Sequence, residues 1–160
     1  MQTAQDIPYS SIRLRGALTD WLASLPSDYY VTFNFNTHTT LASGRTTLKR
    51  FHAMLDRKLY GRHFNRMKPD ERTLFIAFPE HVESNLHYHA LLCSKHPDFT
   101  STAEKIWESI LPSGSLHIID LNAKGASKFD LLNIAQYNTK ELHRDSRYED
   151  FIISSQFSAI

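Results

Sequence analysis

The pattern that constrains the fold of this chain most tightly is a strict alternation of apolar and polar side chains over residues 29–36. The two sets interleave one by one: Val31, Phe33 and Phe35 against Thr32, Asn34 and Asn36. Successive side chains of an extended chain point to opposite faces. The alternation therefore predicts a β-strand with one apolar face and one polar face.

Other segments have periods that predict helices and further strands. Apolar residues at helical spacing predict four helices. The first covers residues 10–24, and the second runs from a cap at Thr46 or Thr47 to Gly61. The third runs from a Ser101–Glu104 capping box to Pro112, and the fourth covers residues 128–144 after a cap at Ser127. Alternating or apolar runs predict strands over 73–78, 86–92 and 116–121. We expect a polar loop at 37–44, and the tail from Asp145 receives no assignment.

After the first helix the expected order is β-α-β-β-α-β-α. Its first six elements match the ferredoxin-like βαββαβ arrangement, an antiparallel sheet with helices packed on it. We therefore expect an α+β fold in which residues 1–160 form a single domain, with a C-terminal helix after the last strand.

Length and composition exclude several classes of protein. The 160 residues, 41% of them hydrophobic, suffice for one domain with one core. No apolar run is long enough to cross a bilayer, and the first ten residues lack the apolar stretch of a signal peptide, so we expect no membrane partner. A single cysteine, Cys93, cannot form an internal disulfide, which favours a cytoplasmic location. The chain has no Gly-Lys-Ser or Gly-Lys-Thr, so we expect no nucleotide-hydrolysing P-loop.

Charge is unevenly distributed although the net charge is only +1. Residues 45–72 carry nine basic side chains against three acidic ones, and the rest of the chain is acidic. Such a basic block is typical either of a solvated helix face or of a surface that binds polyanions.

The strongest chemical signal is the pair His87 and His89 within a predicted strand. Residues two apart on a strand share a face, so the two imidazoles form half of a metal site. Hard divalent ions also take carboxylate ligands. Zinc is disfavoured, because the chain has one cysteine and no His-Glu-x-x-His.

Several residues are candidates for the third ligand. Glu80 ends the preceding strand, and a strand end is a firmer platform than a loop, so Glu80 is favoured. Glu83 and His81, in the turn, could also reach the pair, and Glu141 on the last helix is a further alternative.

Tyr137 lies on the polar side of the last predicted helix, with Lys140 about one turn further on. A tyrosine that packs into a core would fall on the apolar side instead. A phenol is a poor nucleophile at its ordinary pKa of about 10, and a nearby cation or metal can activate the reaction. Tyr137 is therefore a candidate nucleophile or an exposed tyrosine on a solvated helix.

Three of these stretches together resemble the motifs of the HUH endonucleases, and within them the single-tyrosine Rep class that initiates rolling-circle replication. The stretches are Val31–Asn36, Leu86–His89 and Tyr137–Lys140. The second and third match well and the first loosely; Tyr88, between the histidines, is amphipathic where an aliphatic residue is usual.

The resemblance implies an enzyme that nicks and joins single-stranded DNA. His87, His89 and Glu80 would hold Mg²⁺ or Mn²⁺, Tyr137 would attack the phosphodiester to give a 5′-phosphotyrosine and a free 3′-hydroxyl, and Lys140 would assist. The partner would be single-stranded DNA at a replication origin, with a helicase in trans or in a further C-terminal region. Polar and basic residues would contact this DNA: Asn34, Asn36, Arg45, Lys49, Arg57, Lys58, Arg62 and Arg66.

Two other functions fit the same pattern. An HUH-type single-strand DNA transposase would use Glu141 rather than Glu80 as the third ligand. A non-catalytic ferredoxin-like module would bind nucleic acid through its sheet, although the Lys/Arg-Gly-Phe core of RNA-recognition domains is absent from the chain.

Overall fold

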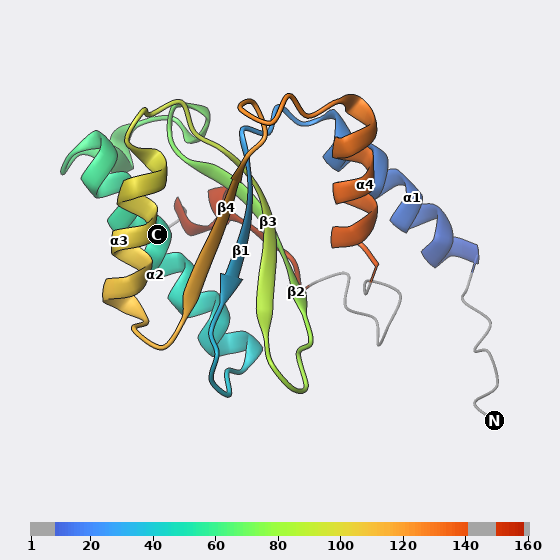
Figure 1. Ribbon diagram of the computed structural model, residues 1–160, viewed down its shortest axis with the longest axis horizontal. Coiled ribbons are helices and arrows are strands. Elements are labelled where there is room, and N and C mark those ends of the chain that lie inside the picture. The colour runs from blue at the N-terminus through green and yellow to red at the C-terminus, as the bar shows by residue number, and fades with distance from the viewer. Residues whose placement is uncertain (1–8, 141–149, 159–160) are drawn as a thin grey trace. The chain divides into compact units, whose positions relative to one another are not determined.

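The computed structural model describes residues 9–140 and 150–158, which belong to two compact units. A helical unit, within residues 1–25 and 126–149, contains α1 (Tyr9–Ser24) and α4 (Lys128–Asn138). A sheet unit, within residues 26–125 and 150–160, contains α2 (Leu41–Tyr60), α3 (Phe99–Ile110) and a five-stranded sheet (Figure 1). That the two units act as the single domain expected from the sequence stays a prediction.

The sheet consists of β1 (Tyr29–Asn34), β2 (Leu74–Glu80), β3 (His87–Cys93), β4 (Ser115–Asp120) and β5 (Ile152–Ile153). Its strand order is β4-β1-β3-β2-β5, and every neighbouring pair is antiparallel. The predicted α+β class with an antiparallel sheet is therefore confirmed. The tail that the sequence left unassigned supplies β5, the edge strand beside β2.

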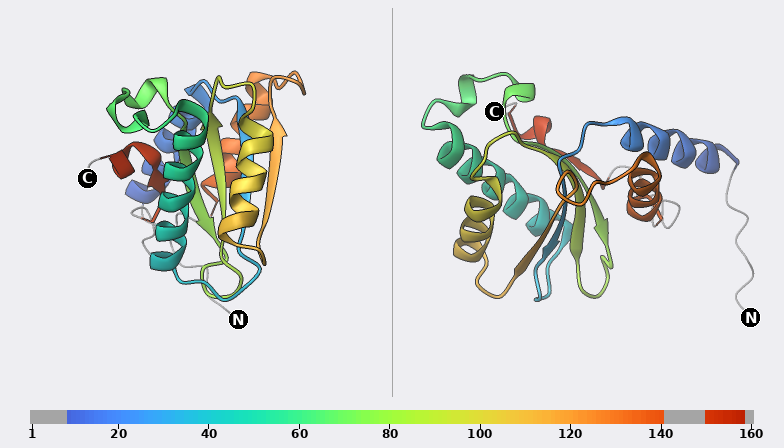
Figure 2. Two further views of the ribbon diagram at one scale, coloured as in Figure 1. Left: turned by 90° about the vertical axis from the view of Figure 1, so that its left-hand side faces the viewer. Right: turned by 45° about the horizontal axis from the view of Figure 1, so that its top comes forward.

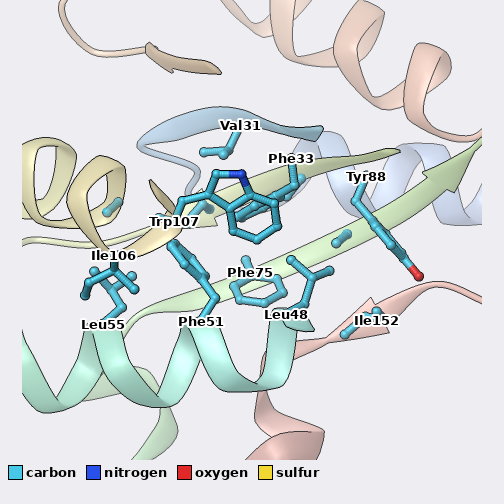
Figure 3. Packing of buried hydrophobic residues seen from close by; sticks show 14 of the residues in the cluster. Val31, Phe33, Leu48, Phe51, Leu55, Phe75, Tyr88, Ile106, Trp107 and Ile152 are labelled. Carbon is cyan, nitrogen blue, oxygen red and sulfur yellow. The ribbon is translucent and has the colours of Figure 1, made fainter. Parts of the chain in front are cut away.

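One face of the sheet is covered by α2 and α3, which lie side by side on it (Figure 2). The apolar positions of β1 pack there against aromatic and aliphatic side chains of both helices (Figure 3). The main members of this core are Val31, Phe33, Leu48, Phe51, Leu55, Phe75, Tyr88, Ile106 and Trp107. Because neighbouring residues alternate between faces, Thr32 on β1 and His87 and His89 on β3 belong to the opposite face.

The N-cap of α2 lies six residues before Thr46 and seven before Thr47, the two caps that the sequence predicts. Thr40 is the N-cap, and its side-chain oxygen accepts a hydrogen bond from the Ser43 amide at 3.1 Å. Thr46 and Thr47 lie inside the helix, where their hydroxyls donate to the carbonyls of Ala42 and Ser43. The predicted cap at Thr46 or Thr47 is therefore wrong. The predicted loop over 37–44 is wrong for residues 41–44, which are helical.

Gly44 lies in the first turn of α2, and a glycine there favours a loop when the sequence alone is considered. A Cβ at this position would lie 3.0 Å from Leu86 Cδ2 and 3.0 Å from Tyr88 Cε2. The glycine therefore serves the close approach of α2 to β3, and does not break the helix.

Helix α3 also begins before its predicted cap. Asp98 is the N-cap residue, and the Ser101–Glu104 capping box is wrong because the buried Phe99 extends the helix toward its N-terminus. The ring of Phe99 packs 4.4 Å from that of Tyr29, centroid to centroid. The predicted end before Pro112 is confirmed, since α3 ends at Ile110.

In the helical unit, α1 and α4 pack against each other, and Thr19 and Thr139 share a buried hydrogen bond of 3.0 Å. The predicted cap of α4 is confirmed, because Ser127 and Asp130 form a capping box. The predicted continuation of this helix beyond Asn138 is wrong, because Thr139 is the C-cap. The Thr139 hydroxyl donates a hydrogen bond to the Ala135 carbonyl. Residues 141–144 of the predicted helix lie outside the described residues. None of the described helices is long and apolar enough to span a bilayer.

Candidate metal centre

The β2–β3 hairpin brings one carboxylate and two imidazoles together on the face of the sheet opposite α2 and α3. Glu80, the last residue of β2, is the direct cross-strand partner of His87, and His89 lies two residues further along β3. Strand β2 extends to Glu80, two residues beyond its predicted end, so the strand itself positions the carboxylate.

The ligand atoms converge closely. Glu80 Oε2 lies 2.8 Å from His87 Nε2 and 2.6 Å from His89 Nε2. Glu80 is only 3% exposed, and both imidazoles are largely buried. Burial of a carboxylate is costly unless it is compensated, and a bound cation would supply that compensation. Within the described part of the chain, this is the one group of three such side chains that could hold a metal ion.

Hydrogen bonds to the far nitrogens orient both rings. His87 Nδ1 lies 3.1 Å from the carbonyl oxygen of Asn85, and a carbonyl can only accept, so Nδ1 donates. His89 Nδ1 shares a hydrogen bond of 3.1 Å with Thr32 Oγ1. With its proton on Nδ1, an imidazole would offer the Nε2 lone pair to an ion bound between the two rings and the carboxylate.

The spacing suits a divalent ion with room for further ligands. Two ligands at right angles, each about 2.1 Å from an octahedral ion, lie about 3 Å apart. The observed 2.6 and 2.8 Å need only a small opening to admit the ion. One carboxylate and two imidazoles would leave the remaining octahedral positions for water or a phosphate oxygen, and this mixed donor set accepts Mn²⁺ as well as Mg²⁺.

Two further residues support the group of Glu80, His87 and His89, hereafter the metal group, and neither was predicted from the sequence. Thr32, the cross-strand partner of His89, supports that ring, and Tyr30 stacks on it with ring centroids 5.8 Å apart. Thr32 belongs to the same polar alternation as Asn34, so its face was foreseeable. Its pairing with His89 depends on the register of β1 against β3, which local sequence does not encode.

The remaining candidate ligands are not among these three converging side chains. Glu83 is exposed in the turn between β2 and β3. His81 is exposed, with its Nε2 3.7 Å from Glu80 Oε1. Glu141 lies outside the described residues.

The candidate nucleophile belongs to the helical unit. Tyr137 lies in the last turn of α4 and is 45% exposed. Lys140 follows the helix, and its ammonium nitrogen lies 3.6 Å from the centre of the Tyr137 ring. The expected proximity of Lys140 to Tyr137 is therefore present, as a cation–π contact.

The predicted DNA-binding residues divide between the two faces of the sheet unit. Asn34 pairs with His87 and lies on the metal face. Asn36, with φ 57°, donates a 3.1 Å hydrogen bond to the Ser113 carbonyl and so supports a turn. The basic residues belong to α2 and the turn after it, on the opposite face: Arg45, Lys49, Arg57, Lys58, Arg62 and Arg66.

Comparison of the chain with protein-family models, with curated proteins and with solved structures finds no match.

Proposed function

We propose that this protein is a metal-dependent endonuclease of the HUH type that nicks and rejoins single-stranded DNA to initiate rolling-circle replication. The observation that carries the proposal is the convergence of Glu80, His87 and His89 on one face of the sheet. A metal site with open positions, mounted on paired strands, is a suitable support for phosphoryl transfer.

The arrangement of the strands supports a ferredoxin-like frame for this enzyme. The elements follow the order β1-α2-β2-β3-α3-β4, and β3 lies between β1 and β2 in the sheet. The two histidines are thus on a central strand, where both neighbours fix the backbone that carries them.

The chemistry proposed is a transesterification. The bound ion would neutralise charge on the phosphate oxygens. Tyr137 Oη would lose its proton and bond to phosphorus, the bond from phosphorus to the 3′-oxygen would break, and that oxygen would take up a proton. The ammonium of Lys140, adjacent to the tyrosine, would stabilise the same negative charge. One phosphoester replaces another, so the step is reversible and needs no ATP.

The position of Glu80 also distinguishes the Rep class from the transposase class of HUH enzymes. Its carboxylate is in the metal group, which supports the Rep-type ligand set rather than the transposase type. We expect Glu80→Ala to abolish Mn²⁺ binding and Glu141→Ala to leave it within about twofold, as measured by Mn²⁺ electron paramagnetic resonance. The reverse pattern would favour the transposase.

The activity is tested by trapping the covalent intermediate. The protein would be incubated with Mn²⁺ and a library of single-stranded oligonucleotides of random sequence, and adducts that survive denaturation would be counted and sequenced. We expect wild-type protein to form adducts of a restricted sequence class, and Tyr137→Phe to form none while still binding DNA.

Tyr60→Phe is the matched control, because it removes a phenol oxygen from α2, away from the proposed chemistry. It should form adducts at the wild-type level. Adducts that persist in Tyr137→Phe would refute the nucleophile. If no variant forms adducts but all bind single strands, the protein is a binding module.

A further inference from the structure

His81 occupies an unusual position beside the metal group. It directly follows Glu80, and in a continuing strand its side chain would point to the opposite face. The backbone at His81 instead has φ 54°. Its ring lies 5.2 Å from the ring of His87, and its Nε2 lies 3.7 Å from Glu80 Oε1.

The backbone conformation at His81 has a cost. A left-handed conformation is disfavoured by about 1 kcal/mol or more for a residue with a Cβ, and glycine or asparagine adopts it more readily. The turn holds this conformation, since the amides of Ser84 and Asn85 both donate to the His81 carbonyl at 3.1 Å. The result is a third imidazole on the side of the sheet that carries the other two.

We propose that His81 is a fourth metal ligand, which gives the centre a second, four-coordinate mode for Zn²⁺. This inference rests on the metal centre of the proposed function, and not on the DNA cleavage. Three imidazoles and one carboxylate are a donor set that suits tetrahedral Zn²⁺, which binds N and O ligands more tightly than Mn²⁺ does.

This mode requires a rotation of the exposed His81 side chain toward the other three ligands. Two ligands of a tetrahedral zinc ion, each about 2.0 Å from it, lie about 3.3 Å apart. His81 Nε2 lies 3.7 Å from Glu80 Oε1, the second oxygen of the carboxylate whose Oε2 meets His87 and His89, so the His81 ring must turn toward the other three ligands to share their ion. The His81 side chain is 55% exposed, so its ring can turn toward the ion without disturbing the core.

The two modes have different consequences for function. Three ligands leave positions open for a phosphate, whereas four ligands around Zn²⁺ close the centre. Zn²⁺ would therefore occupy the site and exclude the substrate phosphate, so that Zn²⁺ inhibits an enzyme that Mn²⁺ activates.

Co²⁺ and Zn²⁺ binding to the purified protein test the proposal. We expect wild-type protein to give the intense visible absorption of four-coordinate Co²⁺. His81→Asn, which tolerates the positive φ, should give only the weak absorption of six-coordinate Co²⁺. In calorimetric titrations, we expect Zn²⁺ affinity to fall at least about tenfold in His81→Asn, while Mn²⁺ affinity stays within about twofold.

Matched variants separate the possible outcomes. His81→Gly also permits the positive φ, and it replaces His81→Asn if that variant unfolds. His63→Asn removes an exposed imidazole outside the centre and should change nothing. The proposal is overturned if His81→Asn and His81→Gly bind Co²⁺ and Zn²⁺ as the wild type does. If His87→Ala leaves all metal binding intact, the metal centre itself is refuted. If wild-type protein forms no covalent DNA adduct but the metal titrations give the expected results, the proposed DNA cleavage is refuted and His81 remains a ligand.

Discussion

In each imidazole of the metal group, one hydrogen bond to Nδ1 sets the orientation of the ring. The Asn85 carbonyl fixes the proton of His87 on Nδ1, and that contact belongs to the backbone of the turn. His89 relies instead on a side chain, the hydroxyl of Thr32 on the neighbouring strand. Partners of this kind hold the ring orientation and the tautomer of a metal-binding histidine.

We predict that Thr32→Val weakens Mn²⁺ binding by about ten- to a hundredfold, the range typical for loss of such a partner. Valine has nearly the same shape and favours strands, so the fold should be kept. Calorimetric titration with Mn²⁺ measures the effect, and thermal unfolding in EDTA checks the fold.

Thr32→Ser retains the hydroxyl and should bind Mn²⁺ within a few-fold of the wild type. Equal losses in the serine and valine variants would mean that packing of the threonine methyl, and not the hydrogen bond, supports His89.

At the scale of elements, a buried polar cluster joins α2 to the start of β2. The carboxylate of Asp56, which is fully buried, accepts hydrogen bonds from Arg72 Nε at 2.8 Å and from the Thr73 amide at 3.3 Å. His52, one turn earlier on α2, lies 2.7 Å from the Thr73 carbonyl and donates to it through Nε2. The Arg72 guanidinium also lies 5.0 Å from the centre of the Phe64 ring, so the cluster ties down the segment between the two elements.

Asp56→Ala should destabilise the protein by about 3–5 kcal/mol, because it removes the buried carboxylate that pairs with the Arg72 guanidinium. Urea unfolding followed by circular dichroism measures the change.

Asp70→Ala removes an exposed carboxylate of the same segment and should cost less than about 0.5 kcal/mol. An Asp56→Ala variant as stable as Asp70→Ala would show that Arg72 finds another partner.

At the scale of the whole molecule, the same cluster links folding to pH. Burial lowers the pKa of His52 below its ordinary 6.5, against the opposing effect of the Asp56 carboxylate, and Arg72 lowers it further. The rings of Phe75 and Phe157 complete its surroundings. The folded protein therefore keeps His52 neutral at a pH where the unfolded chain already binds a proton.

The free energy of unfolding should consequently fall as the pH drops below about 6.5, the unfolded value, until the lowered folded pKa is reached. This group alone contributes a slope of at most about 1.4 kcal/mol per pH unit, the value for one proton. His52→Gln cannot titrate, so its slope between pH 7 and pH 5 should be smaller than that of the wild type. Unfolding measured in EDTA keeps the metal ligands from contributing metal-dependent changes, and equal slopes would contradict the prediction.

Features that depend on near neighbours in the chain could be predicted from the amino-acid order alone. Alternation placed Val31 and Phe33 on one face of a strand and Thr32 and Asn34 on the other, and the same period put His87 and His89 side by side. Capping chemistry located the start of α4 at Ser127, because the cap needs only residues three apart. The order β1-α2-β2-β3-α3-β4 followed from these local patterns, whereas β5 did not.

Features that depend on contacts between distant residues required the three-dimensional fold. The sequence left four candidates for the third metal ligand: Glu80, His81, Glu83 and Glu141. The register of β2 against β3 places Glu80 directly opposite His87. The close packing of α2 on β3 explains Gly44, and it places the basic residues of α2 on the face opposite the metal group. Register and burial are set by the pairing of strands and helices far apart in sequence, so no local period encodes them.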